Sequence, residues 1–389
     1  RILFEFCWRL HWTSAGYDPG KEALLFASRG GLRLQFLHER FLRVNECRKS
    51  LRHIPFWISR FAALKMIFPE NPEWVAASLV REFASGNCAA LAEALLPEAL
   101  FPEKSALIAG LPPELAAAPV NRETVFRLCY ERCDYSEALR RHLEEQHEFG
   151  HNYLKTSFSD FRRLHLVDTG WYGSILGSLE TGCPQWLWDA LYFGRWNYRD
   201  RIPWYFNDVI GLFLDGSGFS PPGLNAVLLE YHHLLEGVLE PPMPSVEFFT
   251  ADGGCNARTD DWEQRVAGSP DEEIWEGVKR YFSVPHPLDT EAVLAESGRA
   301  LRRLRRLIRY PRPAEVEFLL VPDRSADFGK RESTPVIVRN ATAHGNYWRT
   351  VKWSLWPPGT IAASGGGCVA GRQLLWQTLR RIRKIRGAV

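Results

Sequence analysis

Apolar runs with the length of buried strands alternate with segments of helical periodicity through the first half of the chain. These runs end in glycine or polar turns, and they lie at 23–27, 53–59, 164–168 and 186–196. Residues 32–44, between the first two runs, keep their apolar positions on one helix face. Strands that alternate with helices are typical of a parallel sheet, so we expect a doubly wound, Rossmann-like α/β fold.

Interruptions of this pattern divide the chain further. Residues 66–150 are rich in Ala and Leu and are broken repeatedly by proline, which indicates a helical insertion rather than more sheet. Later in the chain, the spacing predicts a helix over 289–310 and a strand over 336–338. The predicted parts are the first part of the core at 1–65, the insertion at 66–150, the second part of the core at 151–250, and an α+β extension with basic helices at 251–389.

The composition is that of an ordinary globular protein. Of 389 residues, 46% are hydrophobic and 24% are charged, and the net charge of +2 gives no bulk field that would attract nucleic acid. The eight cysteines form no CxxC pair, which is typical of free thiols in a reducing compartment. No apolar run is long enough to span a bilayer, and no signal peptide is recognisable. We therefore expect a cytoplasmic protein with no nucleic-acid partner.

The first candidate site follows the third predicted strand. A carboxylate at the strand end, Asp168, can accept hydrogen bonds from sugar hydroxyls, act in catalysis or hold a divalent ion such as Mg²⁺. Gly170 and Gly173 let backbone N–H groups converge, Ser174 adds a hydroxyl, and the next helix presents its positive end. We expect Trp171 to face a ligand from this loop. The alternative is a tight structural turn capped by Ser and Asp.

The turn after the first predicted strand repeats this arrangement with Ser28, Arg29, Gly30 and Gly31. Here Arg29 supplies a charge that can pair with phosphate. If the two strands are neighbours, the two turns can hold a phosphate or pyrophosphate between them. This arrangement resembles the site of phosphoribosyltransferases, whose loop has two adjacent acids before a Thr-Gly-x-Thr turn, whereas Val167 precedes the single acid of this chain.

Six segments carry a further resemblance: LLFASRGG (24–31), IPFWISR (54–60), LHLVDTGWYGSILGSL (164–179), LWDALYFG (187–194), LLEYHHLLEG (228–237) and WSLWPPGT (353–360). They occur in the order seen in bacterial proteins described as HAD-superfamily hydrolase-like, which are found in capsule and O-antigen clusters. The chain resembles the C-terminal portion of those proteins. In them a HAD domain with a nucleophilic aspartate comes first; no DxDxT strand is present here, so phosphatase chemistry is not carried over.

The resemblance implies a domain that binds a phosphorylated or nucleotide-linked sugar in surface-polysaccharide biosynthesis. The family's first turn usually reads Ser/Ala-Arg-Asp-Gly, and Gly30 stands here in place of the acid. The chain is therefore expected either to be a transferase or hydrolase, or to be a non-catalytic accessory domain that docks a glycosyltransferase or a membrane complex. In the second case Gly30→Asp would recover activity.

A different motif, HEFGH, occupies 147–151 and satisfies the HExxH pattern. In zinc hydrolases of this pattern, His147 and His151 would bind the metal and Glu148 would activate water. The residues before it are polar, and the nearest third ligand, Glu180, lies beyond a predicted strand. We therefore expect no metal ligands here and a solvated helix end at Gly150, with a zinc metallopeptidase as the alternative.

The last candidates are Glu230 and two basic runs. Glu230, in a helical stretch with His232 and His233, is a second candidate acid or base, with a structural hydrogen-bonding role as the alternative. The basic residues suit peripheral contact with an anionic inner-membrane surface, or contact with RNA, although no RNA-binding signature accompanies them; a solvated face is favoured over both. They are Arg302, Arg303, Arg305, Arg306 and Arg309, and Arg380, Arg381, Arg383, Lys384 and Arg386.

Overall fold

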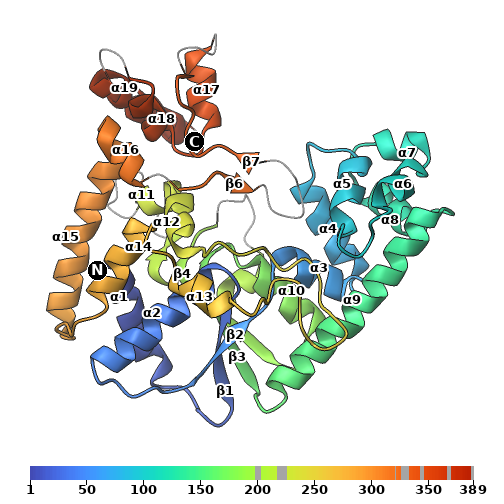
Figure 1. Cartoon of the computed structure of the whole chain (residues 1–389), viewed down its shortest axis with the longest axis horizontal. Helices are drawn as coiled ribbons and strands as arrows, with labels where there is room; N and C mark the ends of the chain where they lie inside the picture. The colour runs from blue at the N-terminus through green and yellow to red at the C-terminus, as the bar shows by residue number, and fades with distance from the viewer. Residues whose placement is uncertain are drawn as a thin grey trace.

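Five parallel strands form the centre of the computed structural model, which describes residues 1–197, 203–216, 226–319, 321–325, 333–341, 346–365 and 369–386 (Figure 1). The strands are β1 (Glu22–Ala27), β2 (Arg52–Phe56), β3 (Arg163–Trp171), β4 (Leu187–Arg195) and β5 (Val209–Asp215), in the order β2-β1-β3-β4-β5. The predicted mixed α/β architecture with a parallel sheet is confirmed, and the four strands predicted in the first half of the chain are present. This arrangement is consistent with a Rossmann-like α/β fold.

Helices cover both faces of this sheet because its strands bury side chains on both sides. In β1, Leu25 packs with one apolar cluster while Leu24 and Phe26 pack with the other. The first cluster includes apolar residues of α3 (Arg60–Ile67), α9 (Asp134–Phe158) and α10 (Ser174–Gly182). The second includes those of α1 (Ile2–Ser14), α2 (Gly30–Val44), α12 (His232–Leu239) and α15 (Thr290–Arg309).

Between β2 and β3 the described chain is helical. After α3 come α4 (Pro72–Glu82), α5 (Cys88–Leu95), α6 (Lys104–Ala109), α7 (Pro113–Ala117), α8 (Arg122–Tyr130) and the 25-residue α9 (Figure 1). The helix end predicted at Gly150 is wrong, because α9 continues through this residue to Phe158. A Cβ at Gly150 would lie 2.7 Å from Met66 Cγ, so the glycine serves a close helix contact rather than a stop.

The second half adds further helices, a pair of two-residue strands and β5, a longer strand that the sequence pattern did not predict. Gly211 lies in this strand, opposite a register shift in β4, and Ile210 is exposed, so the apolar run is short and irregular. The remaining elements are η1 (Trp204–Asp208), α11 (Ala226–Glu230), α13 (Trp262–Ala267), α14 (Glu273–Tyr281), α16 (Pro313–Leu319), β6 (Arg324–Ser325), β7 (Ser333–Thr334), α17 (Tyr347–Trp353), α18 (Pro357–Ala363) and α19 (Val369–Arg386).

Two expectations for this half have clear outcomes. The helix predicted over 289–310 is α15. The strand predicted over 336–338 is wrong: the pairing lies at 333–334, and the backbone N–H of Val336 instead donates to Asp323 Oδ1 at 2.9 Å. Across the ranges given above, no helix combines the length and apolar character that crossing a bilayer requires.

Helix glycines give a direct test of the packing. A Cβ at Gly177, in α10, would lie 2.4 Å from the buried Tyr205 ring, so Gly177→Ala is expected to destabilise the fold by about 1–3 kcal/mol. Gly277, in α14, is exposed with no atom within 4 Å of such a Cβ, so Gly277→Ala is expected to stabilise it by roughly 0.5–1 kcal/mol. Urea unfolding of both variants measures this, and equal effects would contradict the packing.

Candidate functional site

The two turns predicted to bind a ligand lie side by side at the carboxyl edge of the sheet. Strands β1 and β3 pair directly, with Phe26 opposite Val167. From these strands the chain leaves toward opposite faces, since α2 packs its apolar residues in one cluster and α10 packs its apolar residues in the other. In open α/β sheets, ligands bind in the crevice at such a switch point. The condition that the two strands be neighbours is therefore met.

Glycines bring the two turns into contact. A Cβ at Gly30 would lie 2.9 Å from Thr169 Cγ2 and 3.6 Å from Asp168 Oδ1, and a Cβ at Gly31 would lie 2.8 Å from the carbonyl oxygen of Val167. Only glycine allows this approach without movement of the neighbouring turn. The expected recovery by Gly30→Asp is at odds with this geometry, because a second carboxylate would be forced against Thr169 and Asp168.

Asp168 is the central titratable group of this edge. Its Oδ1 accepts a hydrogen bond from the backbone N–H of Thr169 at 2.8 Å. Burial raises the pKa of Asp168 to about 7, the hydrogen bond from Thr169 opposes this rise, and Glu236 and Glu240 add to it. The carboxyl group is therefore partly protonated near neutral pH, as suits a group that gives or takes a proton during a reaction.

Arg29 has a strained backbone and an occupied side chain. Its φ of 69° with ψ of −109° is unusual for a residue with a Cβ and is typical of functional sites. The guanidinium forms an ion pair with Glu240 and donates to Ser245 Oγ at 2.8 Å. An anion that binds Arg29 would therefore have to compete with Glu240, and the pairing of Arg29 with phosphate stays a prediction.

Ser28 and Trp171 do not have the predicted roles either. The N–H of Ser28 donates to Phe56 O at 2.8 Å and its hydroxyl to Ile58 O at 2.5 Å, so both groups join β1 to the chain after β2. Trp171 belongs to β3, is only 5% exposed, and donates from Nε1 to Glu236 Oε1 at 2.8 Å. Its ring is packed in the core rather than turned toward a ligand.

The remaining candidate residues, Gly170, Gly173 and Ser174, each have a structural role. Gly170, at φ 116°, allows β3 to approach β4, since a Cβ there would lie 2.0 Å from Gly194 O. Gly173, at φ 81°, is the N-cap of α10, and Ser174 is the first residue of that helix. The helices α2 and α10 begin directly after the two turns, and in the first turn of α2 the N–H of Leu32 donates to Arg29 O at 3.2 Å.

The second predicted catalytic residue, Glu230, lies elsewhere. Its buried carboxylate forms ion pairs with Arg309 at 3.7 Å and Arg380 at 3.8 Å, which join α11 to α15 and α19. The contacts of Glu230 are therefore those of a structural residue, as the alternative prediction stated. Arg309 and Arg380, which were predicted to lie on basic faces, instead pair with this carboxylate. Arg306 pairs with Glu315. The side chains of Arg381, Arg383, Lys384 and Arg386 lie outside the described residues.

Two glutamates that raise the pKa of Asp168, Glu236 and Glu240, were not predicted from the sequence. Glu236 lies on α12 and Glu240 directly follows it, far along the chain from β3. The ring of His232 lies 5.1 Å from that of Trp171, and donor atoms of His232, His233 and Glu236 lie within 4.8 Å of one another. The sequence around 228–237 predicts a helix, but it does not predict which strand of the sheet this helix contacts.

The HExxH motif lies on α9 and shares no residue with this edge. His147 and His151 group with Glu70 rather than with Glu180, which the zinc alternative named as the nearest third ligand, and Glu148 is exposed.

No protein-family model matches the chain. A search of curated proteins likewise finds no match.

The titration of Asp168 predicts a pH dependence of stability. Because its folded-state pKa is raised, the folded chain keeps a proton that the unfolded chain loses between about pH 4 and pH 7. The free energy of unfolding is therefore expected to fall by a few kcal/mol as the pH rises through this window. Asp168→Asn should remove this component of the slope, as measured by urea unfolding at pH 5 and pH 8. The exposed Asp160→Asn should keep it; a slope shared by both variants would contradict the assignment.

The ion pairs of Glu230 predict a structural phenotype. Glu230→Gln removes the negative charge that pairs with the buried Arg309, so the free energy of unfolding is expected to fall by roughly 3 kcal/mol or more. The exposed pair of Glu317 with Arg339 provides the control, and Glu317→Gln is expected to change stability little. Denaturant midpoints that are equal for the two variants would show that Glu230 does not hold these helices together.

Proposed function

We propose that the chain binds and acts on a phosphorylated or nucleotide-linked sugar at the edge where β1 and β3 end. The observation that carries the proposal is the position of Asp168, a half-buried residue whose carboxyl group has a pKa near neutrality, at the switch point of the sheet. The resemblance to HAD-superfamily hydrolase-like proteins of capsule and O-antigen clusters supports a place in bacterial surface-polysaccharide biosynthesis.

In this proposal the two helix N-termini receive the anionic part of the ligand. The first turns of α2 and α10 begin at Gly30 and Ser174, so their N–H groups flank the point where β1 and β3 end. Arg29 joins the phosphate by exchanging Glu240 for it, since a bidentate guanidinium suits both partners. The proposal thus retains the arrangement that resembles phosphoribosyltransferases, in which two turns bind one anion between them.

Asp168 has the acid–base role. In its ionised form it removes a proton from a sugar hydroxyl, and in its protonated form it delivers one to a leaving oxygen. Glu236 and Glu240 are near enough to raise its pKa, so the edge holds three carboxylates. Carboxylate oxygens are the ligands that Mg²⁺ takes, and these three residues would hold the ion together with the phosphate of the substrate. Bound Mg²⁺ would supply charge neutralisation for that phosphate.

The finer architecture is part of the same proposal. Helices α4 to α9 are an insertion in a doubly wound core, and the elements from α13 onward are an extension (Figure 1). The exposed Arg302 and Arg303 on α15 suit loose contact with the anionic cytoplasmic side of the inner membrane, where lipid-linked sugars are assembled.

Ligand binding and turnover test the proposal together. Thermal-shift measurements with nucleotide sugars, sugar phosphates and phosphoribosyl pyrophosphate, each with and without Mg²⁺, are expected to give at least one stabilising ligand. For that ligand, Asp168→Asn is expected to lower turnover by about 10²–10⁴-fold with the fold intact. Asp160→Asn, an exposed aspartate before β3, is the matched control and is expected to leave turnover unchanged.

The outcomes separate the alternatives. Turnover that Asp168→Asn leaves unchanged would exclude Asp168 as the acid or base. Binding without turnover would favour the non-catalytic accessory domain, and no stabilising ligand in any of the three classes would overturn the proposal.

A further inference from the structure

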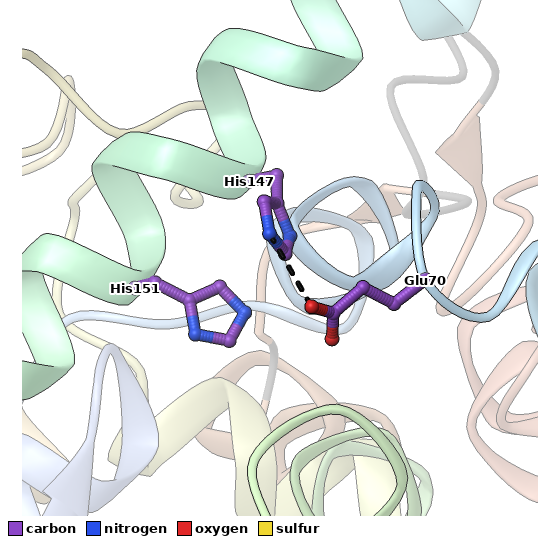
Figure 2. A group of neighbouring side chains, drawn as sticks. All are labelled: Glu70, His147 and His151. Carbon is purple, nitrogen blue, oxygen red and sulfur yellow. Dashed lines mark ion pairs between the residues drawn. The ribbon is translucent and has the colours of Figure 1, made fainter.

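Three metal-ligating side chains meet beside α9, away from the proposed sugar site. His147 and His151 lie one turn apart on this helix, with their ring centroids 4.4 Å apart. Glu70, between α3 and α4, places Oε1 3.7 Å from His147 Nε2. Figure 2 shows both imidazoles projecting from α9 toward the Glu70 carboxylate. One donor atom from each residue lies within 4.8 Å of the others, close enough for a single ion to bind all three.

The tautomer of His147 is fixed for metal binding. Its Nδ1 lies 2.9 Å from the carbonyl oxygen of Met66, and because a carbonyl can only accept, Nδ1 must donate. The lone pair is therefore on Nε2, the atom that faces Glu70. Metal-ligating histidines usually make this same outer hydrogen bond to a backbone carbonyl or carboxylate, which orients the ring.

His151 supplies the second, independent observation. Its Nε2 is buried and has no hydrogen-bond partner in the described part of the chain. A buried polar atom without a partner is uncommon in folded proteins, and a neutral ring nitrogen is the form that binds metal. A bound cation would give this nitrogen its missing partner.

Gly150 explains how the group is held together. A Cβ at this position would lie 2.7 Å from Met66 Cγ and 3.1 Å from Phe249 Cδ2, so the glycine lets α9 approach α3 closely. This approach brings the Met66 carbonyl and the chain that leads to Glu70 to the histidine face of α9. The glycine inside the HExxH segment thus contributes to the spacing of the ligands.

We propose that His147, His151 and Glu70 form a Zn²⁺ site. Two imidazole nitrogens and one carboxylate oxygen are a donor set typical of zinc, with the fourth position left for water, whereas Mg²⁺ and Ca²⁺ prefer oxygen donors alone. The Glu70 side chain is 56% exposed, so the ion can enter from solvent. The third ligand comes from α3–α4 and precedes the motif in the chain. This site is independent of the sugar site proposed above.

Zinc stoichiometry and affinity of the full-length chain test the proposal. After chelator treatment, titration with ZnCl₂ is expected to show one ion per chain by calorimetry and elemental analysis. Alanine at His147, His151 or Glu70 is expected to weaken Zn²⁺ binding by more than about 100-fold, beyond the usual effect of losing an outer-shell partner. Glu148→Ala is the matched control, because Glu148 is an exposed acid of the same motif outside the group, and it is expected to keep the affinity within a few-fold.

Circular dichroism of the zinc-free variants checks that they are folded, and Glu70 is exposed enough for its variant to fold normally. Cobalt substitution gives a second readout, in which four-coordinate Co²⁺ produces visible absorption that Glu70→Ala abolishes and Glu148→Ala retains. The proposal is overturned if the native chain binds no stoichiometric zinc, or if Glu148→Ala weakens binding as much as Glu70→Ala does.

Discussion

The parallel pairing of β1 with β3 is the constraint on which the candidate sugar site depends. It places Phe26 opposite Val167 although the helices α3 to α9 and the strand β2 separate these residues in the chain. Because the two strands are in register, Arg29 follows the end of β1 beside Asp168, where the pairing of β3 with β1 ends while β3 continues to Trp171 beside β4. The following helices then diverge to opposite faces, and glycines allow the two turns to approach each other closely.

Charge at this edge limits what it can bind. Asp168, Glu236 and Glu240 are three acids, and the raised pKa of Asp168 reflects burial and the two glutamates, whose effect the lowering by Arg29 does not offset. An anionic ligand would meet net repulsion if all three were ionised. Protonation of Asp168 or a divalent cation removes part of this repulsion, so the raised pKa and the proposed Mg²⁺ are two solutions of the same electrostatic problem.

Helices and strands could be predicted from the sequence better than the side-chain contacts between them. Strands with unbroken apolar runs were located, whereas β5 was missed because Gly211 and the exposed Ile210 interrupt its pattern. The predicted third strand ended at Asp168, whereas β3 continues to Trp171, so Gly170 and Trp171 lie in the strand rather than in a loop after it. Periodicity also does not state which distant side chain fills a contact. The ion pair of Glu240 with Arg29, the hydrogen bond from Trp171 to Glu236 and the ion pairs of Glu230 with two arginines were therefore not predictable. Gly150 shows the same limit, since a helix stop and a close helix contact differ only by the presence of Met66 opposite.

The two sites differ in what binding would cost. At the sheet edge, Arg29 is already paired with Glu240 and the Trp171 indole with Glu236, so a ligand must exchange partners within the protein before it gains contacts. Its apparent affinity is reduced by the fraction of molecules in which that exchange has occurred. Beside α9, the His147 ring is already oriented by the Met66 carbonyl and His151 Nε2 has no partner to lose. Because these ligands are already oriented, less of the binding free energy is lost in ordering them. The group of Glu70, His147 and His151 is therefore expected to bind its ion more tightly than three unoriented side chains would.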